Sequence, residues 1–236
     1  MASSVIGVPV RRLLGSVCWG LWLTMAPLSP PAAEVITEAE YAIRWNPRDG
    51  GPQNAVEVLQ WLEKKPKEPV HYSVRYFDLP RPASAPEGAS VILRQRSKSG
   101  GKTQIRLKYR RPEPLTSEWG CPTDEFEQSS EIDVAWLGQG QKTSVSYSCT
   151  LKAESPPAEL AARPKPCMAQ MTRYEVGGLK VEEWQLSGGD LLLELSRQEQ
   201  DSPAGRQGFQ RLVDQLLARG VRPADRSKTE LGSECP

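Results

Sequence analysis

Apolar and polar residues alternate along most of the chain between residues 35 and 200. This period of two is typical of β-strands, because successive side chains of a strand point to opposite faces. We therefore predict about eight strands, in the ranges 35–45, 71–79, 91–111, 131–136, 142–152, 170–176, 179–186 and 190–197. The range 91–111 contains the turn signal Ser99-Gly100-Gly101 and is expected to form a hairpin.

Two segments follow the helical period instead. Residues 54–65 place their apolar residues on one side, with Asn54 as a cap and Pro66 as a stop. Residues 208–219 carry one apolar stripe and end at Gly220. Many strands and few helices predict an α+β fold in which the helices flank a sheet.

Charge is distributed unevenly along this pattern. The hairpin at 91–111 holds eight cations and no acid: Arg94, Arg96, Lys98, Lys102, Arg106, Lys108, Arg110 and Arg111. Strand parity places five of them on one face: Arg94, Arg96, Arg106, Lys108 and Arg110. Such neighbours repel unless anions are close. The anions could be acidic residues on facing strands or a bound polyanion, and a solvated basic face is the alternative.

Acidic strand faces occur elsewhere in the chain. Glu38 and Glu40 share one face of their strand, and Glu131 and Asp133 share one face of another. Glu194 lies inside a run of leucines, so its side chain faces either solvent or a polar interior.

A sheet with one charged and one apolar face can close into a barrel. If helices cover the outside, the charged faces point into the lumen. Carboxylates hold hard cations and Arg or Lys clamp phosphate oxygens, so such a lumen would bind a divalent cation together with a polyphosphate.

The N-terminus has the pattern of a secretory signal peptide. Arg11 and Arg12 precede an apolar run at 13–28, and small residues follow up to Ala33. We expect a signal peptide at 1–33, a domain at 34–222 and a tail at 223–236. The mature protein would be periplasmic or secreted, without a stable membrane span, and an uncleaved membrane anchor is the alternative.

Cysteine usage agrees with export. Outside the signal peptide four cysteines remain, and an even count in an oxidising compartment predicts two disulfides. Cys121 with Cys149 is our first choice of pair, because these residues flank the strands around 131–151. Cys167 with Cys235 would then tie back the tail. Free thiols are the alternative.

Composition limits the function classes. Lys and Arg number 30 against 29 Asp and Glu, which excludes a globally basic nucleic-acid binder. The basic hairpin has only Tyr109 for base stacking, so we expect no nucleic-acid partner. The composition, with His71 as its single histidine, argues against a histidine-rich zinc site.

The motifs, taken in order, resemble the CYTH superfamily of triphosphate tunnel metalloenzymes. They are Glu38-Ala39-Glu40, Tyr76-Phe77-Asp78, the stretch at 91–96, Ile105-Arg106-Leu107-Lys108 and Leu193-Glu194-Leu195 before a helix. The resemblance covers the chain from 34 to the last predicted helix. It implies an antiparallel eight-stranded tunnel that binds inorganic or nucleotide triphosphate with Mg²⁺ or Mn²⁺.

The resemblance also implies roles for individual residues. The substrate-binding cations would be Arg94, Arg96, Arg106, Lys108 and Arg173. The metal-binding acids would be Glu38, Glu40, Glu131, Asp133 and Glu194. A further acid would be Glu182 or Glu183, and the motif does not decide between them.

The chain departs from the pattern of the family at three positions. Ala42 and Met171 stand where the family has lysine, and Ser196 stands where it has the second Glu of a closing Glu-x-Glu. Loss of a carboxylate weakens two-metal chemistry. Three functions therefore remain open: a divalent-metal-dependent phosphohydrolase acting on phosphoanhydrides, a tunnel that binds a phosphorylated small molecule or polyphosphate without turnover, and a scaffold protein of the cell envelope.

Overall fold

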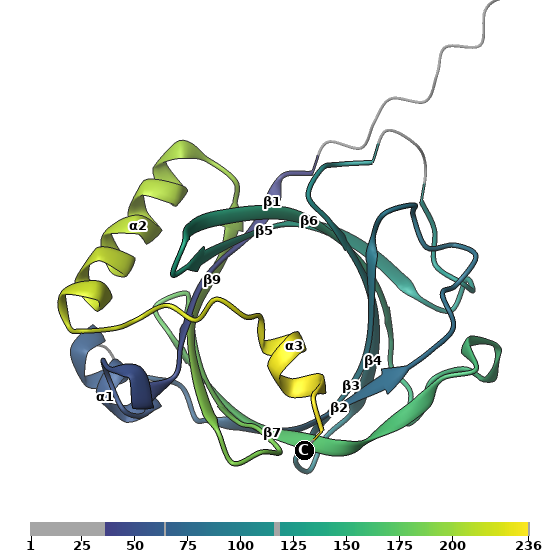
Figure 1. Ribbon diagram of the computed structural model, residues 1–236, viewed down its shortest axis with the longest axis horizontal. Coiled ribbons are helices and arrows are strands. Elements are labelled where there is room, and N and C mark those ends of the chain that lie inside the picture. Colours follow the sequence, from purple (N-terminus) through teal and green to yellow (C-terminus); the bar gives the residue numbers. More distant parts are fainter. Residues whose placement is uncertain (1–35, 64, 116–118, 236) are drawn as a thin grey trace, which may run out of the picture. The chain divides into compact units, whose positions relative to one another are not determined.

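The computed structural model describes residues 36–63, 65–115 and 119–235 (Figure 1). Nine strands and three α-helices lie in these ranges. The strands are β1 (Glu38–Trp45), β2 (Val70–Asp78), β3 (Ser90–Lys98), β4 (Thr103–Arg111), β5 (Glu127–Leu137), β6 (Gly140–Leu151), β7 (Arg163–Val176), β8 (Leu179–Gln185) and β9 (Leu191–Gln200). The helices are α1 (Ala55–Leu62), α2 (Pro203–Ala218) and α3 (Lys228–Ser233), with short 3₁₀ turns at Pro47–Asp49 and Ala158–Leu160.

The strands form one closed barrel in the order β1-β5-β6-β4-β3-β2-β7-β8-β9, with β9 pairing back onto β1. Every pair is antiparallel except β1 with β5, which run parallel. The predicted α+β barrel is confirmed, whereas the expected eight strands and wholly antiparallel order are wrong. Each predicted run became a strand, and the hairpin at 91–111 supplied two of them, which makes nine.

The parallel pair follows from how the barrel closes. With nine strands in one ring, consecutive antiparallel neighbours cannot alternate direction all the way round, so one pair must run parallel. The register places Glu40 opposite Asp133 across that pair. Closure therefore brings two of the predicted acids side by side.

Strand β7 begins earlier than the alternation indicated. Its first half, Arg163 to Met168, precedes the predicted run at 170–176 and contains Pro164 and Pro166. This half pairs with β2 alone, since β8 pairs with β7 only from Gln170 onward. A proline is tolerated where one side of a strand has no ladder partner.

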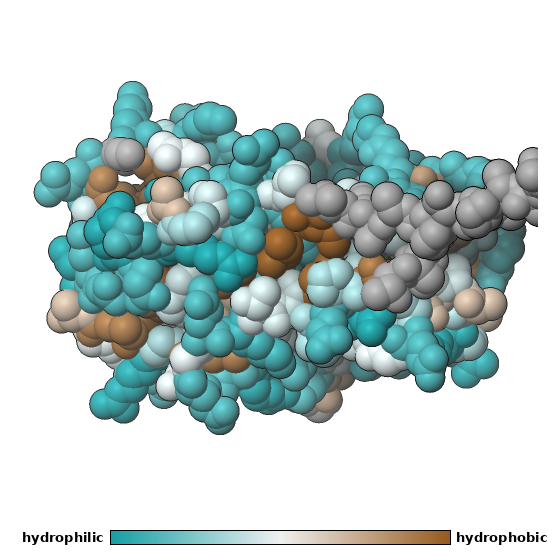
Figure 2. Space-filling model, turned by 90° about the horizontal axis from the view of Figure 1, so that it is seen from above, coloured by the Kyte–Doolittle hydropathy of each residue, from teal (hydrophilic) through white to brown (hydrophobic). Residues whose placement is uncertain are grey.

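The apolar faces of the strands point outward and are covered. One outer cluster packs under α1 and α2 and includes Tyr41, Trp45, Trp136, Leu195 and Phe209. A second lies between β3, β4, β6 and the long connections, and includes Leu107, Tyr109, Tyr147 and Cys149. Figure 2 shows that the face seen from above is mainly hydrophilic, with apolar residues confined to small areas. The opposite faces of these strands carry the charged residues and line the lumen, as the sequence predicted.

Both helices that the sequence predicted are present and capped. The cap at Asn54 was predicted, whereas α2 begins at Pro203, before the predicted start at residue 208. The side chain of Asn54 accepts a hydrogen bond from the backbone N–H of Glu57 at the start of α1. Ser202 caps α2 in the same way and Pro203 follows it. These two helices cover one side of the barrel (Figure 1).

The C-terminal segment, expected to be a tail, contains α3, which lies across one mouth of the barrel (Figure 1). Its Leu231 packs against a third apolar cluster on the inner wall, which includes Tyr76, Met171, Trp184 and Leu192. Both predicted disulfides, Cys121–Cys149 and Cys167–Cys235, are present.

The predicted signal peptide lies outside the described residues. Among the helices that the structure describes, none combines the length and the hydropathy of a membrane-spanning segment.

Candidate functional site: the charged lumen of the barrel

A cavity of about 190 Å³ lies inside the barrel. Seven of the ten predicted site residues line it: Glu40, Arg94, Arg96, Arg106, Lys108, Glu131 and Arg173. They come from β1, β3, β4, β5 and β7, so the closed barrel brings together residues that lie up to 133 positions apart. Nine of the lining residues are Lys or Arg and two are Glu, so the walls are strongly positive.

Three guanidinium groups on β3 and β4, those of Arg94, Arg96 and Arg106, form one wall of this cavity. Arg94 lies directly opposite Arg106 in the antiparallel register, and Arg96 follows on the same face. Among the residues that the structure describes, none of the three forms an ion pair. The Nε atoms of Arg96 and Arg106 are buried and have no hydrogen-bond partner. Buried polar atoms without partners are rare in folded proteins, so this wall has unused capacity for an anion.

The electrostatics of this wall agree with its geometry. Burial, and then the neighbouring charges of Arg94 and Arg173, lower the pKa of Arg96 to about 9. Burial and the charge of Arg94 likewise lower the pKa of Arg106. A pKa of about 9 leaves Arg96 charged at neutral pH. The charged state is therefore disfavoured in place, and a bound anion would relieve it.

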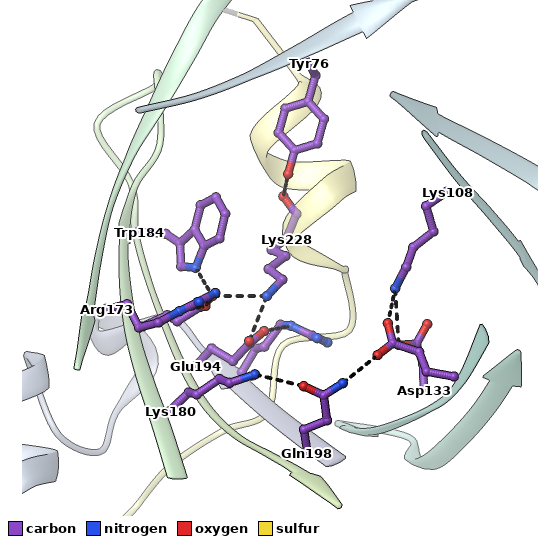
Figure 3. Close-up of polar contacts among 12 residues, drawn as sticks. Tyr76, Lys108, Asp133, Arg173, Lys180, Trp184, Glu194, Gln198 and Lys228 are labelled. Carbon is purple, nitrogen blue, oxygen red and sulfur yellow. Dashed lines mark hydrogen bonds and ion pairs between the residues drawn. The ribbon is translucent and has the colours of Figure 1, made fainter. Parts of the chain in front are cut away.

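Three carboxylates face these cations across the lumen. One oxygen from each of Glu40, Glu131 and Asp133 lies within 4.8 Å of the others. Lys108 Nζ lies 2.8 Å from Glu131 and 3.5 Å from Asp133 (Figure 3). Arg110 Nε lies 2.9 Å from Asp133. All three predicted metal ligands of this group thus meet in space, and protein cations balance them.

Nearby cations hold Glu40 and Asp133 of this group in the charged form. Burial acts to raise the pKa of Glu40, but the ammonium groups of Lys228 and Lys108 outweigh it and the net shift is downward. Burial opposes the shift at Asp133 in the same way, and Lys108 and Arg110 lower its pKa. The carboxylates are therefore ionised at neutral pH, as hard-cation ligands must be.

The opposite wall, on β8 and β9, differs in that its charges are paired. Glu182 and Glu194 are cross-strand partners and fully buried. Arg173 Nε and Lys228 Nζ lie 2.9 and 3.1 Å from Glu182 oxygens, and Lys228 Nζ lies 2.8 Å from Glu194 (Figure 3). Arg44 donates its Nε–H to the other oxygen of Glu194. Every carboxylate oxygen here has a protein donor.

Three residues with predicted roles, Glu194, Arg173 and Glu38, lie in surroundings that differ from those roles. Glu194 is enclosed by Arg44 and Lys228 and lies outside the group of three carboxylates. Arg173 lines the cavity but is paired with Glu182. Glu38 is exposed, at the start of β1, and lines neither described cavity.

Sequence reasoning left Glu182 or Glu183 open, and the pleat decides between them. Glu182 points into the lumen, whereas the Glu183 carboxylate accepts a hydrogen bond of 2.9 Å from the backbone N–H of Ala55. Arg44 was missed as a site residue although it shares the face of Glu38 and Glu40. Lys228 was missed because it lies in the segment expected to be a tail.

A second cavity of about 310 Å³ adjoins the first and shares five lining residues with it: Glu40, Arg44, Ile92, Arg110 and Thr229. Its remaining walls are less charged and include Ala42, Val134, Ala135 and Leu137. Residues of the C-terminal segment from Asp225 to Glu230 border it.

Comparisons with known proteins add limited information. No model of a known protein family matches the chain, and no curated protein matches it. Two solved structures that match are the PH1819 protein of Pyrococcus horikoshii OT3 and a protein of Vibrio parahaemolyticus provisionally named an adenylate cyclase. The first is 12% identical with a TM-score of 0.46, and the match covers 81% of this chain and 97% of that chain. The second is 14% identical with a TM-score of 0.47, covering 85% and 100%. The closed barrel is established by the strand pairing of this chain.

Proposed function

We propose that the lumen binds a short polyphosphate, such as a triphosphate, together with a divalent cation. The observation that carries this proposal is the wall of three guanidinium groups without carboxylate partners. Guanidinium groups bind phosphate oxygens through paired, charge-assisted hydrogen bonds. Arg94 and Arg106 lie opposite each other and Arg96 follows, so the row matches a ligand with several linked anionic groups.

The three carboxylates supply a second part of the proposed site. Glu40, Glu131 and Asp133 offer oxygen atoms only, which is the donor type that Mg²⁺ and Mn²⁺ prefer. These residues would hold the cation beside the phosphate-binding wall. Such a cation supplies charge neutralisation for phosphate oxygens when it is bound.

Hydrolysis of a phosphoanhydride is the second candidate, and the nearness of the carboxylates to the cationic wall favours it. Cations on a transferring phosphoryl group stabilise the charge that develops there. Ala42, Met171 and Ser196 reduce the charged set relative to the family that the sequence resembles. We therefore propose binding first and turnover second, and membership in the CYTH superfamily remains part of this proposal.

The compartment is part of the same proposal. Two disulfides are typical of proteins in oxidising compartments, and the N-terminal sequence has a signal-peptide pattern. We infer a periplasmic or secreted protein whose ligand is a phosphorylated compound met outside the cytosol.

Titration calorimetry with tripolyphosphate, with and without Mg²⁺, tests the proposal. Arg94→Ala removes a guanidinium from the wall and should weaken binding by about 1.5–3 kcal/mol, or roughly 10- to 100-fold. Arg48→Ala is the matched control, since Arg48 is an exposed arginine paired with Asp190 away from the lumen. Equal affinity in both variants would contradict the proposed wall.

Glu40→Gln separates the cation from the phosphate. This change removes one negative charge from the group of three carboxylates and should abolish the gain in affinity that Mg²⁺ gives. A phosphate-release assay on the same samples distinguishes hydrolysis from binding. If tripolyphosphate, longer polyphosphate and nucleoside triphosphates all fail to bind, the barrel is a scaffold and this proposal is wrong.

A further inference from the structure

We propose that the C-terminal strap, residues Pro223–Cys235, is a working part of the ligand site and that Lys228 on it is an additional phosphate-binding cation. This inference rests on the proposed function. It concerns a segment that the sequence marked only as a tail.

The strap is fixed at both of its ends. At its start, Pro223 forms a β-bridge with Trp45, and the Ala224 N–H donates to the carbonyl of Arg44 at 2.7 Å. At its end, Cys235 forms a disulfide with Cys167 on β7. A segment tied at both ends across a barrel mouth loses little further freedom when a ligand binds, so it is preorganised.

The middle of the strap is fitted to the inner wall. A Cβ on Gly232 would lie 2.9 Å from Cε2 of Tyr76, so glycine permits this close approach. The Tyr76 hydroxyl donates to the carbonyl of Lys228 at 3.5 Å (Figure 3). Leu231 packs into the apolar cluster below. These contacts set the depth to which Lys228 reaches.

Lys228 points from the strap into the lumen, where it lies 5.3 Å above the ring of Trp184 (Figure 3). Its ammonium group has three N–H donors, and the oxygens of Glu182 and Glu194 take two of them. The third donor has no partner among the described residues. Because Lys228 and its neighbour Thr229 both line the cavity of the guanidinium wall, that donor is available to a ligand there.

The cavity exists with the strap in place, so the strap forms a wall and does not fill the site. Lys228 thus borders the same space as the guanidinium wall and Glu40, one of the cation-binding acids. A ligand that contacts both would lie beside it.

Substitution of Lys228 tests the inference by tripolyphosphate titration in Mg²⁺. Lys228→Gln should weaken binding about 10-fold, because one charge-assisted contact is lost, and Lys228→Arg should restore most of the affinity. Lys67→Gln is the matched control, since Lys67 is an exposed lysine paired with Glu175 outside the lumen. Wild-type affinity in a folded Lys228→Gln protein would overturn the inference.

A second pair of variants keeps the test decisive if Lys228→Gln does not fold. Cys167→Ser with Cys235→Ser releases the end of the strap and leaves Lys228 present, and we expect several-fold weaker binding. Cys121→Ser with Cys149→Ser removes the other disulfide, which lies on the outer face of the barrel, and should leave affinity unchanged. Hydrogen exchange at residues 224–235 verifies the release of the strap.

The outcomes separate the two proposals. Unchanged or tighter binding after the strap is released means that the strap is structural or obstructive; the inference then fails while the proposed function stands. If the wild-type protein binds no tripolyphosphate, the proposed function fails and the ligand-binding role of Lys228 fails with it.

Discussion

Two opposite walls of the same lumen handle buried charge in different ways. On β8 and β9, Glu182 and Glu194 meet Arg44, Arg173 and Lys228, and every carboxylate oxygen has a donor. On β3 and β4, Arg94 lies opposite Arg106 and Arg96 follows on the same face, and none of the three has a carboxylate partner among the described residues. The first wall resembles a structural ion-pair network and the second resembles a binding surface prepared for an absent anion.

The difference has a physical meaning. A buried charge costs free energy unless a partner offsets the loss of hydration. A wall whose carboxylates are all matched internally gains stability, and only a donor that is left over on it, such as the third N–H of Lys228, stays available to an outside anion. A wall that leaves its charges unmatched gives up stability and keeps its affinity for outside ions. Each wall should therefore respond oppositely when one of its charges is removed.

Glu182→Gln should give the largest effect, a loss of about 3–5 kcal/mol in the free energy of unfolding, because it leaves Arg173 and Lys228 without their shared carboxylate. Urea denaturation followed by circular dichroism measures this.

Glu183→Gln is the control for that variant. Its carboxylate lies on the other face of β8 and accepts one backbone hydrogen bond, from Ala55. We expect a loss of about 1 kcal/mol. Equal losses at the two positions would show that the matched network does not stabilise the barrel.

The contrast between the walls was only partly accessible from the sequence. Strand parity placed five cations on one face, and three of them, Arg94, Arg96 and Arg106, form the guanidinium wall. The same parity left Glu194 undecided, because a lone acid among leucines fits solvent or a polar interior equally well. Its burial depends on Arg44 and Lys228, which come from opposite ends of the chain.

The fold was predictable to a similar degree. Alternation located the strands, since it is a local property of each run. The parallel pairing of β1 with β5 is not local and depends on how the ring closes. Helix α3 has six residues, with a capping box at Ser227 and Glu230, and its place depends on a disulfide and on contacts with β2. A short capped segment gives no hydrophobic period by which to find it.

The matched wall should also govern stability in acid. Burial opposes the shift, but Lys228 and Arg173 lower the pKa of Glu182 well below its ordinary value of 4.5. As the pH falls, this carboxyl is protonated at a higher pH in the unfolded chain than in the folded protein. The stabilisation that ionised Glu182 gives the folded protein is therefore fully present above about pH 5 and is lost as the pH falls below 4.5.

The expected slope is about 1.4 kcal/mol per pH unit for each carboxylate so affected. We therefore expect the free energy of unfolding, measured between pH 6 and pH 3, to fall less steeply with decreasing pH in Glu182→Gln than in the wild type. The two slopes should differ by about 1.4 kcal/mol per pH unit, the contribution of one carboxylate. A parallel pair of curves would mean that Glu182 is not held ionised in the folded protein.

The smallest effect has the opposite sign and concerns the unmatched wall. Arg106→Met removes one of two like charges that lie directly opposite across β3 and β4, and it leaves an apolar side chain of similar length. Without ligand, this should raise the free energy of unfolding by about 0.2–1 kcal/mol. The measurement needs a buffer without phosphate, because phosphate would occupy the wall.

Arg219→Met is the control: Arg219 lies over the ring of Trp61, 4.9 Å from its centroid, and its loss should not stabilise the protein. Tripolyphosphate should then reverse the order, because a ligand that binds the folded state stabilises the wild type by more than the variant. A variant that is less stable than the wild type without ligand would show that Arg106 is already satisfied within the protein, and the contrast between the two walls would be lost.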